Sequence, residues 1–284
     1  ASDTQRDRYL PDLVAGRKIG AWCLTEPSSG SDAAAMKTRA TRSGDNYVLN
    51  GSKMFITNGA VADVYVVMAI TDAAADRSGV SAFIVERGTP GLSNGRKIEK
   101  LGLRSSDTAE VIFDNVTIPG SNLIGDLGAG YRQTLKVLEA GRIGIAGWAT
   151  GIARGAMEDA ATYAKERRQF GQRIADFQAI QWMIADMATR IDASWLLTGR
   201  AAALRDAGRP FAREASMAKL FASETAMWTT TKGVQIHGGY GYVTDFPAER
   251  YMRDAKLSEI GEGTSEVQRM LIAKSLLREG YLPA

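Results

Sequence analysis

Residues 260–269 read IGEGTSEVQR, and the central feature is Glu262, a carboxylate between two glycines just before a helix-like segment. Neighbours without side chains let a bulky group approach the backbone, so that the carboxylate alone reaches into a pocket as a general base. The alternative is a solvated turn in which Glu262 only interacts with the positive end of the following helix. The motif by itself leaves both interpretations open.

The residue pattern after Glu262 predicts a helix, which would hold this carboxylate in a fixed position. Thr264 or Ser265 can cap its start, and Ser265 with Gln268 has the spacing of a capping box. The apolar residues expected on its buried stripe are Val267, Met270 and Leu271.

The composition limits the chemistry that other residues can supply. The chain has 284 residues, of which 45% are hydrophobic, so it can bury a substantial core. Its single cysteine, Cys23, excludes an intrachain disulfide and a cysteine-built metal site, and its single histidine, His237, excludes a histidine cluster. We expect no metal site, a packed or hydrogen-bonded His237, and Cys23 as a small core residue.

Charge and hydropathy argue against nucleic acid and membrane partners. The chain carries 35 Lys+Arg and 32 Asp+Glu residues, a net charge of +3, without a basic tract. No charged start is followed by an apolar stretch, and no apolar run reaches the roughly 18 residues of a transmembrane helix. We therefore expect a soluble protein of a reducing compartment.

The sequence pattern changes twice along the chain, which predicts an α+β fold. Residues 1–20 have the character of a remnant helix and a linker. Residues 21–125 are expected to form a small antiparallel β-barrel or sandwich, with strands near 47–51, 53–57, 63–70, 80–86 and 109–118. Residues 126–284 are expected to form a helical domain like a four-helix bundle, with helices near 131–166, 176–207 and 211–236 and after residue 263.

Glycines recur every three or four residues in the first long helix, at Gly141, Gly144, Gly147, Gly151 and Gly155. This spacing predicts a smooth face against which another helix packs closely, and a ligand in a cleft is the alternative. No glycine-rich Rossmann fingerprint follows a strand, so a nucleotide cofactor would have to be held in another way.

Five stretches, in their order along nearly the entire chain, resemble motifs of the acyl-CoA dehydrogenases, flavoproteins that desaturate acyl-CoA thioesters. AWCLTEPSSGSD (21–32) resembles the first family signature, and NGSKMFITNG (50–59) the loop that lies against the flavin. ERRQFGQRIADFQAIQ (166–181) and QIHGGYGY (235–242) are similar to segments that hold FAD across a dimer interface. RDAKLSEIGEGTSEVQR (253–269) resembles the C-terminal signature, in which Glu262 takes the place of the catalytic base.

The resemblance implies an FAD-dependent acyl-CoA dehydrogenase of fatty acid metabolism, in the bacterial cytoplasm or the mitochondrial matrix. Glu262 would remove the α-proton, the β-hydrogen would pass as hydride to N5 of FAD, and a trans-2-enoyl-CoA would form. Such a base must be desolvated, which raises its pKa toward neutrality, and aimed at the α-carbon. An electron-transferring flavoprotein is the implied electron acceptor.

Several FAD contacts are implied in the first two motifs. Those in the first loop, for which an ordinary Ser/Gly loop is the alternative, are Leu24, Thr25, Gly30 and Ser31. Thr57 corresponds to a residue beside the flavin N5 edge. Phe55 stands where many members have a tryptophan that shields the ring.

Other FAD contacts are implied from a neighbouring subunit, so the resemblance also implies a homodimer or homotetramer. Arg167 would pair with pyrophosphate through charge-assisted bonds next to Phe170, whereas Gln169 departs from the residue that some relatives use. The remaining implied contacts to the phosphates and the adenosine half are Gln235, Gly238, Gly239, Thr264 and Glu266.

On the substrate side, the resemblance implies that Glu139 and Arg142 contact the CoA portion, with Arg142 near its phosphates, and a solvated i,i+3 pair is the alternative. Some branched-chain relatives carry their base at the position of Gly141, which cannot do this chemistry, so the base must be Glu262.

Gly261 and Gly263 are expected to line the substrate beside the base. Short- and medium-chain relatives often have tyrosine at the position of Gly261. The missing ring favours branched, cyclic or otherwise broader acyl groups.

Family members begin with a helical domain before the segment that corresponds to YLPDLVAGRK, and this chain starts near the end of that domain. The chain could be a shortened or trimmed member or an engineered minimal form, or another chain could supply the domain. Two other functions stay open: a non-catalytic flavin- or CoA-binding subunit that needs a partner chain, and an acyl-CoA oxidase whose uncovered flavin reacts with oxygen.

Overall fold

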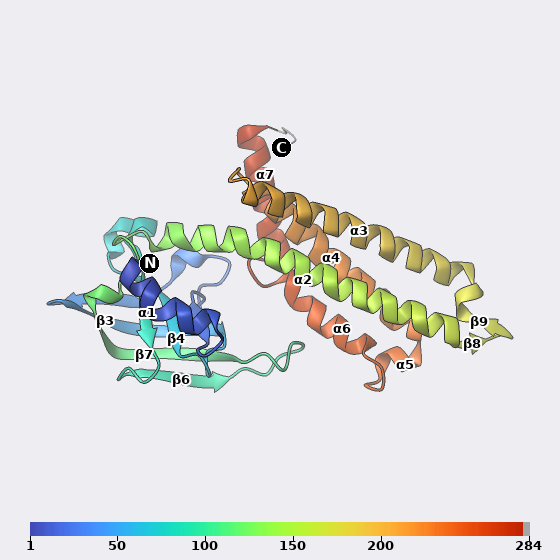
Figure 1. The fold of residues 1–284 in the computed structure, drawn as a ribbon, viewed down its shortest axis with the longest axis horizontal. Helices are drawn as coiled ribbons and strands as arrows, with labels where there is room; N and C mark the ends of the chain where they lie inside the picture. Colours follow the sequence, from blue (N-terminus) through green and yellow to red (C-terminus); the bar gives the residue numbers. More distant parts are fainter. Residues whose placement is uncertain (281–284) are drawn as a thin grey trace. The chain divides into compact units, whose positions relative to one another are not determined.

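In the computed structural model, residues 1–280 are described, and the chain divides into two compact units (Figure 1). Residues 1–100 and 104–135 form the first unit, whereas Leu101–Leu103 belong with residues 136–284 in the second. Among the described residues, no helix is long and apolar enough to cross a membrane.

The first unit is built on a curled β-sheet. It begins with helix α1 (Asp3–Val14), where Ser2 and Gln5 form a reciprocal capping box. The strands that follow are β1 (Gly20–Cys23), β2 (Arg39–Ser43), β3 (Asn46–Thr57), β4 (Val64–Ile70), β5 (Val80–Glu86), β6 (Leu92–Lys97) and β7 (Thr108–Pro119). Their order in the sheet is β1-β4-β2-β3-β7-β6, with β5 also paired to β4.

The sheet differs from the predicted strands in three respects. β1 and β2 both pair in parallel with β4, so the mostly antiparallel sheet is mixed at this point. The segments 47–51 and 53–57 were predicted as separate strands, but they form the single strand β3, which register shifts interrupt without ending it. β1, β2 and β6 were not predicted, because β1 is only four residues long and β2 and β6 are mostly polar and exposed.

The larger of two hydrophobic clusters on this sheet lies among its central strands. It gathers the inward-facing residues of the central strands, among them Leu49, Tyr65, Phe83 and Val111, which are 0–1% exposed. Cys23 is completely buried in this core, as predicted. The core fixes which faces of β3 and of the loop after β1 are left for other contacts.

The second unit is helical. Its long helices are α2 (Gly130–Glu166), whose first turns belong to the first unit, α3 (Gln178–Asp206) and α4 (Ala212–His237). The hairpin β8 (Arg168–Gln169) and β9 (Gln172–Arg173) joins α2 to α3. The shorter helices, of which only α7 was predicted, are α5 (Gly239–Tyr242), α6 (Ala248–Ala255) and α7 (Ser265–Glu279).

Small side chains let these helices pack closely. The buried core of the unit is dominated by alanines, such as Ala146, Ala153, Ala218 and Ala222, all 0% exposed. Alanine forms helix readily and occupies little volume, so the helix axes can approach one another.

The glycine face predicted on α2 is only partly correct. A Cβ at Gly155 would lie 3.5 Å from the hydroxyl of Tyr251 on α6, which agrees with close packing. For Gly144, Gly147 and Gly151, no heavy atom of the described structure lies within 4 Å of such a Cβ. These three glycines therefore face open space.

At the start of α7, the predicted cap is confirmed at Thr264, whereas the predicted capping box of Ser265 and Gln268 and the predicted buried stripe need correction. Thr264 is the N-cap and accepts a bond from the Val267 amide at 3.3 Å, whereas Ser265 does not cap the helix. Met270 is 70% exposed and Leu271 36% exposed, so the predicted buried stripe is wrong at both. The buried side chains at the start of α7 are instead the polar Ser265 and Gln268, because this end of the helix packs against charged groups.

Candidate functional site

Glu262 lies in a strained turn between a 3-10 helix (Lys256–Glu259) and α7. Its φ is 57° and that of Gly263 is 93°, so two successive residues adopt the left-handed region. This conformation is uncommon for a residue with a side chain and is found at functional sites that the surrounding structure holds in place. The positive φ of Gly263 favours glycine at that position. Gly261, in contrast, has no positive φ, and a Cβ there would meet other atoms only at ordinary contact distances.

The carboxylate of Glu262 lies against α2. A Cβ added to Gly141 would come within 2.3 Å of Oε2 and 2.8 Å of Cδ of Glu262, so the missing side chain makes room for the carboxylate. Oε2 is buried and has no hydrogen-bond partner in the structure. An unpartnered buried carboxylate oxygen costs free energy and is available to accept a proton.

The charges around this carboxylate are positive. Burial raises the pKa of Glu262, and the nearby guanidinium of Arg142 and ammonium of Lys219 partly oppose this rise. Arg142 is only 7% exposed, which rules out the solvated pair with Glu139, and its Nε has no hydrogen-bond partner among the described residues. The structure therefore brings Arg142 to the base, which the sequence alone did not indicate.

Two further polar residues hold the turn and were not singled out from the sequence for this role. Lys219 on α4 is 0% exposed, and its Nζ donates to the carbonyl oxygen of Gly263 at 2.7 Å. Nε2 of Gln268 donates to the same oxygen at 2.8 Å. The sequence does show Lys219 among the alanines and hydroxyl residues of α4, which could have marked it as a buried cation. Helical periodicity, however, does not show which residues this lysine contacts.

In the first unit, a buried ion pair anchors the loop that contains Thr25. Lys53 on β3 is 0% exposed and its Nζ donates to Oε1 of Glu26 at 2.8 Å and to the carbonyl of Leu24 at 3.1 Å. Glu26 also accepts from the amides of Lys37 at 2.5 Å and Thr38 at 3.0 Å. This network was not predicted, and it holds Leu24 buried while leaving Gly30 and Ser31 exposed.

The same network places Thr25 beside the end of β3. The amide of Met54 donates to the Thr25 carbonyl at 2.8 Å, next to Phe55. Phe55 has φ 59° at the irregularity of β3 and is 63% exposed, and Thr57 is exposed as well. An aromatic ring held out in a strained conformation can cover a planar ligand.

In the second unit, Phe170 forms the tip of the β8–β9 hairpin. It has φ 51° and is followed by Gly171 at φ 79°, as in a two-residue hairpin turn, and 94% of its surface is exposed. Phe55, Phe170 and Glu262 thus share the rare positive φ, a signal that only the folded backbone provides.

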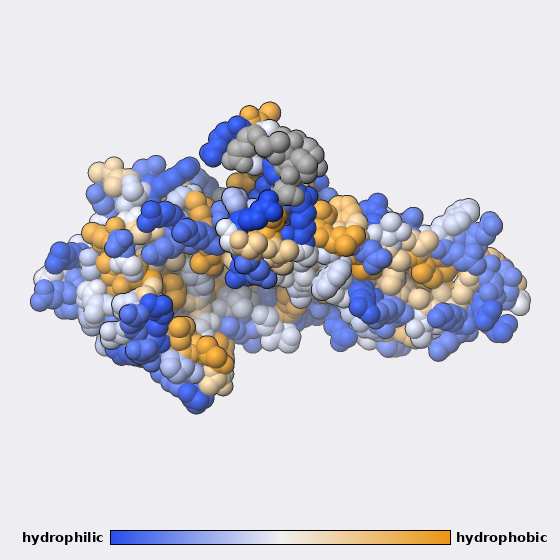
Figure 2. Space-filling view, turned by 45° about the horizontal axis from the view of Figure 1, so that its top comes forward, coloured by the Kyte–Doolittle hydropathy of each residue, from blue (hydrophilic) through white to orange (hydrophobic). Residues whose placement is uncertain are grey.

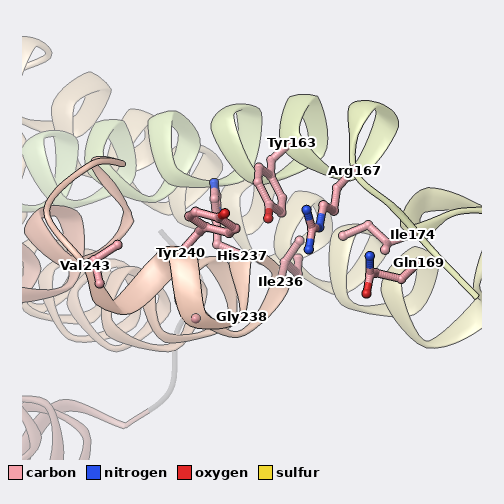
Figure 3. A pocket seen from close by; sticks show the side chains of 10 residues that line it. Tyr163, Arg167, Gln169, Ile174, Ile236, His237, Gly238, Tyr240 and Val243 are labelled. Carbon is pink, nitrogen blue, oxygen red and sulfur yellow. The ribbon is translucent and has the colours of Figure 1, made fainter.

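Arg167 lies near the base of this hairpin in a hollow of about 490 Å³ (Figure 3). Its guanidinium lies 5.6 Å from the ring centroid of Tyr240, and no acidic residue of the described chain pairs with it. In Figure 3, Tyr163 on α2 and Arg167, the residue after the end of α2, project toward His237 and Tyr240. The lining also includes Gln169, Gly238 and Gly239.

His237 has a packing role, as predicted. It is 4% exposed, stacks on Tyr163 with ring centroids 4.4 Å apart, and its Nδ1 lies 2.8 Å from the carbonyl oxygen of Gly233.

The groups in this hollow fit the phosphates of a dinucleotide such as FAD. Cβ atoms at Gly238 and Gly239 would meet no atom within 4 Å, so the backbone there is open to a close ligand. The exposed side chain of Gln235 lies one turn earlier on α4, and Arg167 supplies a guanidinium that no carboxylate of the described residues binds.

The last two implied contacts lie at the start of α7. Thr264 uses its hydroxyl in the N-cap, and Glu266 is exposed in the first turn. Hydrogen bonding to its own amide, followed by the Thr264 hydroxyl, lowers the pKa of Glu266. Both side chains therefore already serve the positive end of this helix.

Comparison with known proteins identifies the family. The family described as "Acyl-CoA dehydrogenase, middle domain" matches residues 21–116, and "Acyl-CoA dehydrogenase, C-terminal domain" matches residues 128–277. The short-chain specific acyl-CoA dehydrogenase of Clostridium acetobutylicum is 49% identical over 277 residues, which cover 98% of this chain and 73% of that protein.

Solved structures agree with these sequence matches. Butyryl-CoA dehydrogenase from Megasphaera elsdenii superposes with a TM-score of 0.96 at 46% identity, covering 98% of this chain and 73% of that one. A chain solved in work on the electron-transferring flavoprotein of Acidaminococcus fermentans matches with the same TM-score and coverage at 50% identity. The predicted family and α+β fold are thereby confirmed, and the chain belongs to the acyl-CoA dehydrogenase family of FAD-dependent oxidoreductases.

Proposed function

We propose that this protein dehydrogenates short-chain acyl-CoA thioesters, with Glu262 as the base that removes the α-proton. The observation that supports this role is the buried, unpartnered Oε2 of Glu262, held in a strained turn beside two cations. Burial strengthens the carboxylate as a base because it raises the pKa, while Arg142 and Lys219 keep an ionised fraction available. When bound, FAD accepts the β-hydrogen as hydride, and a 2-enoyl-CoA is the product.

The short acyl chain is proposed from the relatives, because the matched proteins from C. acetobutylicum and M. elsdenii are a short-chain and a butyryl-CoA enzyme. Gly261 and Gly263 would border the acyl group beside the base. A Cβ at Gly261 would meet only atoms of Leu257, at 3.5 Å or more. The absent side chain would therefore leave room for a branch near the α-carbon.

For FAD we propose two groups of contacts. Thr25, Ser31 and Thr57 supply hydroxyls, with Leu24 and Gly30 supplying backbone groups and Phe55 covering the ring. The second group, which would act on phosphates and adenosine, consists of Arg167, Phe170, Gln235, Gly238, Gly239, Thr264 and Glu266. Glu139 is proposed as a contact of CoA, as is Arg142 from its place beside the base.

We further propose a homo-oligomer in which the second group serves the FAD of a neighbouring subunit. Phe170 is too exposed to be explained by packing within one chain, and Trp182 and Trp195 on α3 are each 64% exposed. Figure 2 shows apolar surface, in orange, interspersed with hydrophilic surface on one face of the protein. Light scattering should give at least twice the mass of 30.5 kDa, and a monomer that retains FAD would contradict this arrangement.

An electron-transferring flavoprotein is the proposed acceptor of the electrons, in line with the structural work that includes the A. fermentans chain. Reduced protein mixed anaerobically with such a flavoprotein should regain its oxidised spectrum. Reoxidation by oxygen with release of hydrogen peroxide would favour the oxidase alternative instead.

The decisive experiment is an anaerobic visible spectrum of the FAD-loaded protein before and after butyryl-CoA, longer straight-chain, branched and cyclic acyl-CoAs. Butyryl-CoA should bleach the flavin bands. Glu262→Gln should retain the flavin but not bleach, whereas Glu158→Gln, which alters an exposed carboxylate on α2, should bleach normally. Bleaching in Glu262→Gln would exclude Glu262 as the base, and a wild type that binds FAD without bleaching would favour a binding subunit.

A further inference from the structure

Lys219 is a buried cation without a salt bridge among the described residues. It lies on α4 with 0% exposure, and its Nζ donates a hydrogen bond to the carbonyl oxygen of Gly263 at 2.7 Å. Burying an ammonium group is costly unless other groups compensate, and packing alone would be served by an apolar side chain of similar length. A specific task at Gly263 would explain its presence.

That task concerns the backbone next to Glu262. With φ of 57° at Glu262 and 93° at Gly263, the turn departs from the conformations that most residues prefer. Gln268 reaches back from α7 and donates to the carbonyls of Gly263 at 2.8 Å and Glu262 at 3.3 Å. Lys219 on α4 and Gln268 on α7 thus hold the same carbonyl from two different helices.

The charge of Lys219 acts on the same carboxylate. The charged groups that face Lys219 are Arg142 on α2, Glu259 in the 3-10 helix before the turn, Glu262 itself and Glu266 on α7. Arg142 and Lys219 are the two cations that favour the ionised form of Glu262 against its burial. Without Lys219, only Arg142 of these two cations would still favour the ionised form of Glu262.

We propose that Lys219 is a positioning residue for the base: it holds the Gly263 carbonyl so that the turn aims Glu262 across Gly141, and its positive charge favours the carboxylate form of Glu262. This inference rests on the proposed role of Glu262. Lys219 donates to the carbonyl oxygen of Gly263, the residue after the base, so it acts through the turn that carries Glu262.

The test uses three variants and one matched control in the full FAD-loaded protein. Lys219→Met removes charge and donor at similar volume, Lys219→Arg keeps the charge, and Gln268→Met removes the other donor without changing charge. Lys232→Met makes the same substitution on the same helix, where Lys232 lies near Trp228 and not near the base. Single-turnover flavin reduction by butyryl-CoA is followed from pH 5 to pH 9, with the melting temperature of each variant.

For Lys219→Met we expect reduction at pH 7 to slow by ~10-fold or more, because small misplacements of a reacting group carry large rate penalties. The affinity for butyryl-CoA should change little, and the acid limb of the pH profile should move to higher pH. Lys219→Arg should return that limb toward the wild-type position. Gln268→Met should slow the reaction with a smaller shift of the limb, and Lys232→Met should behave as wild type.

An acid limb unchanged in Lys219→Met, or an equal effect in Lys232→Met, would overturn the proposal. A second readout does not depend on turnover: the infrared band of the protonated carboxyl that disappears in Glu262→Gln can be titrated in wild type and Lys219→Met. Its midpoint should rise in the variant, and an unchanged midpoint would refute the charge effect. If wild type fails to bleach with any acyl-CoA, the proposed function fails, while this titration still decides the action of Lys219 on Glu262.

Discussion

A single methyl group at Gly141 should disable the base while leaving the fold intact. In Gly141→Ala, the new Cβ would lie 2.3 Å from Oε2 of Glu262, whereas ordinary contact begins at 3.4 Å. The oxygen must therefore retreat by about 1.1 Å (3.4 − 2.3), and misplacement of a reacting group by about 1 Å costs ~10²-fold in rate. This corresponds to about 2.7 kcal/mol of lost transition-state stabilisation.

The stability of Gly141→Ala should not fall with its activity. The methyl group meets the end of a flexible side chain, and replacing glycine with alanine inside a helix favours the helix by about 1 kcal/mol. Gly144→Ala is the matched control, because a Cβ there meets no heavy atom within 4 Å. The assay is anaerobic flavin reduction by butyryl-CoA, combined with thermal unfolding.

We expect Gly141→Ala to reduce its flavin about 100-fold more slowly than Gly144→Ala, with equal FAD content and similar melting temperatures. Wild-type rates in Gly141→Ala would refute the reasoning, because Glu262 could then not be working from the position that the structure shows. An equal loss in both variants would attribute the effect to α2 as a whole and would equally contradict this account.

Three further predictions concern the other buried charges and the hollow around Arg167. Lys53→Met should lower the free energy of unfolding, measured in urea, by about 3–5 kcal/mol because it leaves Glu26 buried without its partner. An equal loss in the double variant Lys53→Met/Glu26→Gln would contradict this pairing. Burial lowers the pKa of Lys219 to about 8, from the ordinary lysine value of 10.5. Between these two pH values the unfolded chain binds more protons than the folded one, so the free energy of unfolding rises with pH there. Urea unfolding at pH 8 and pH 9.5 should show a gain in wild type of up to roughly 1.4 kcal/mol per pH unit relative to Lys219→Met, and parallel curves would refute this linkage. Arg167→Ala should raise the dissociation constant of FAD, measured by flavin fluorescence, ~10-fold or more, since hydrogen bonds to charged groups contribute about 1.5–3 kcal/mol. The same increase in Arg168→Ala, which alters the exposed neighbouring residue, would argue against a specific phosphate contact.

The sequence alone was sufficient for the family, the α+β class and the positions of the long helices. Helical periodicity over α2, α3 and α4 is a local property, and a contiguous motif such as GEGTSEVQR carries its information in neighbouring residues. His237 and Cys23 were also correctly expected to pack in the interior. The strands β2 and β6 were not predicted because their sequences have little alternation of apolar and polar residues.

Only the tertiary structure decided what surrounds the base. Arg142 lies on α2, Lys219 on α4 and Glu262 in the turn before α7, and Lys53 on β3 meets Glu26 in the loop after β1, so no spacing in the sequence relates them. The same holds for α7, where proximity to Lys219 and Glu262 buries Gln268 and leaves Met270 exposed, against the apolar pattern. Burial and electrostatic pairing depend on distances between segments remote in sequence, whereas periodicity and motifs depend on neighbours along the chain.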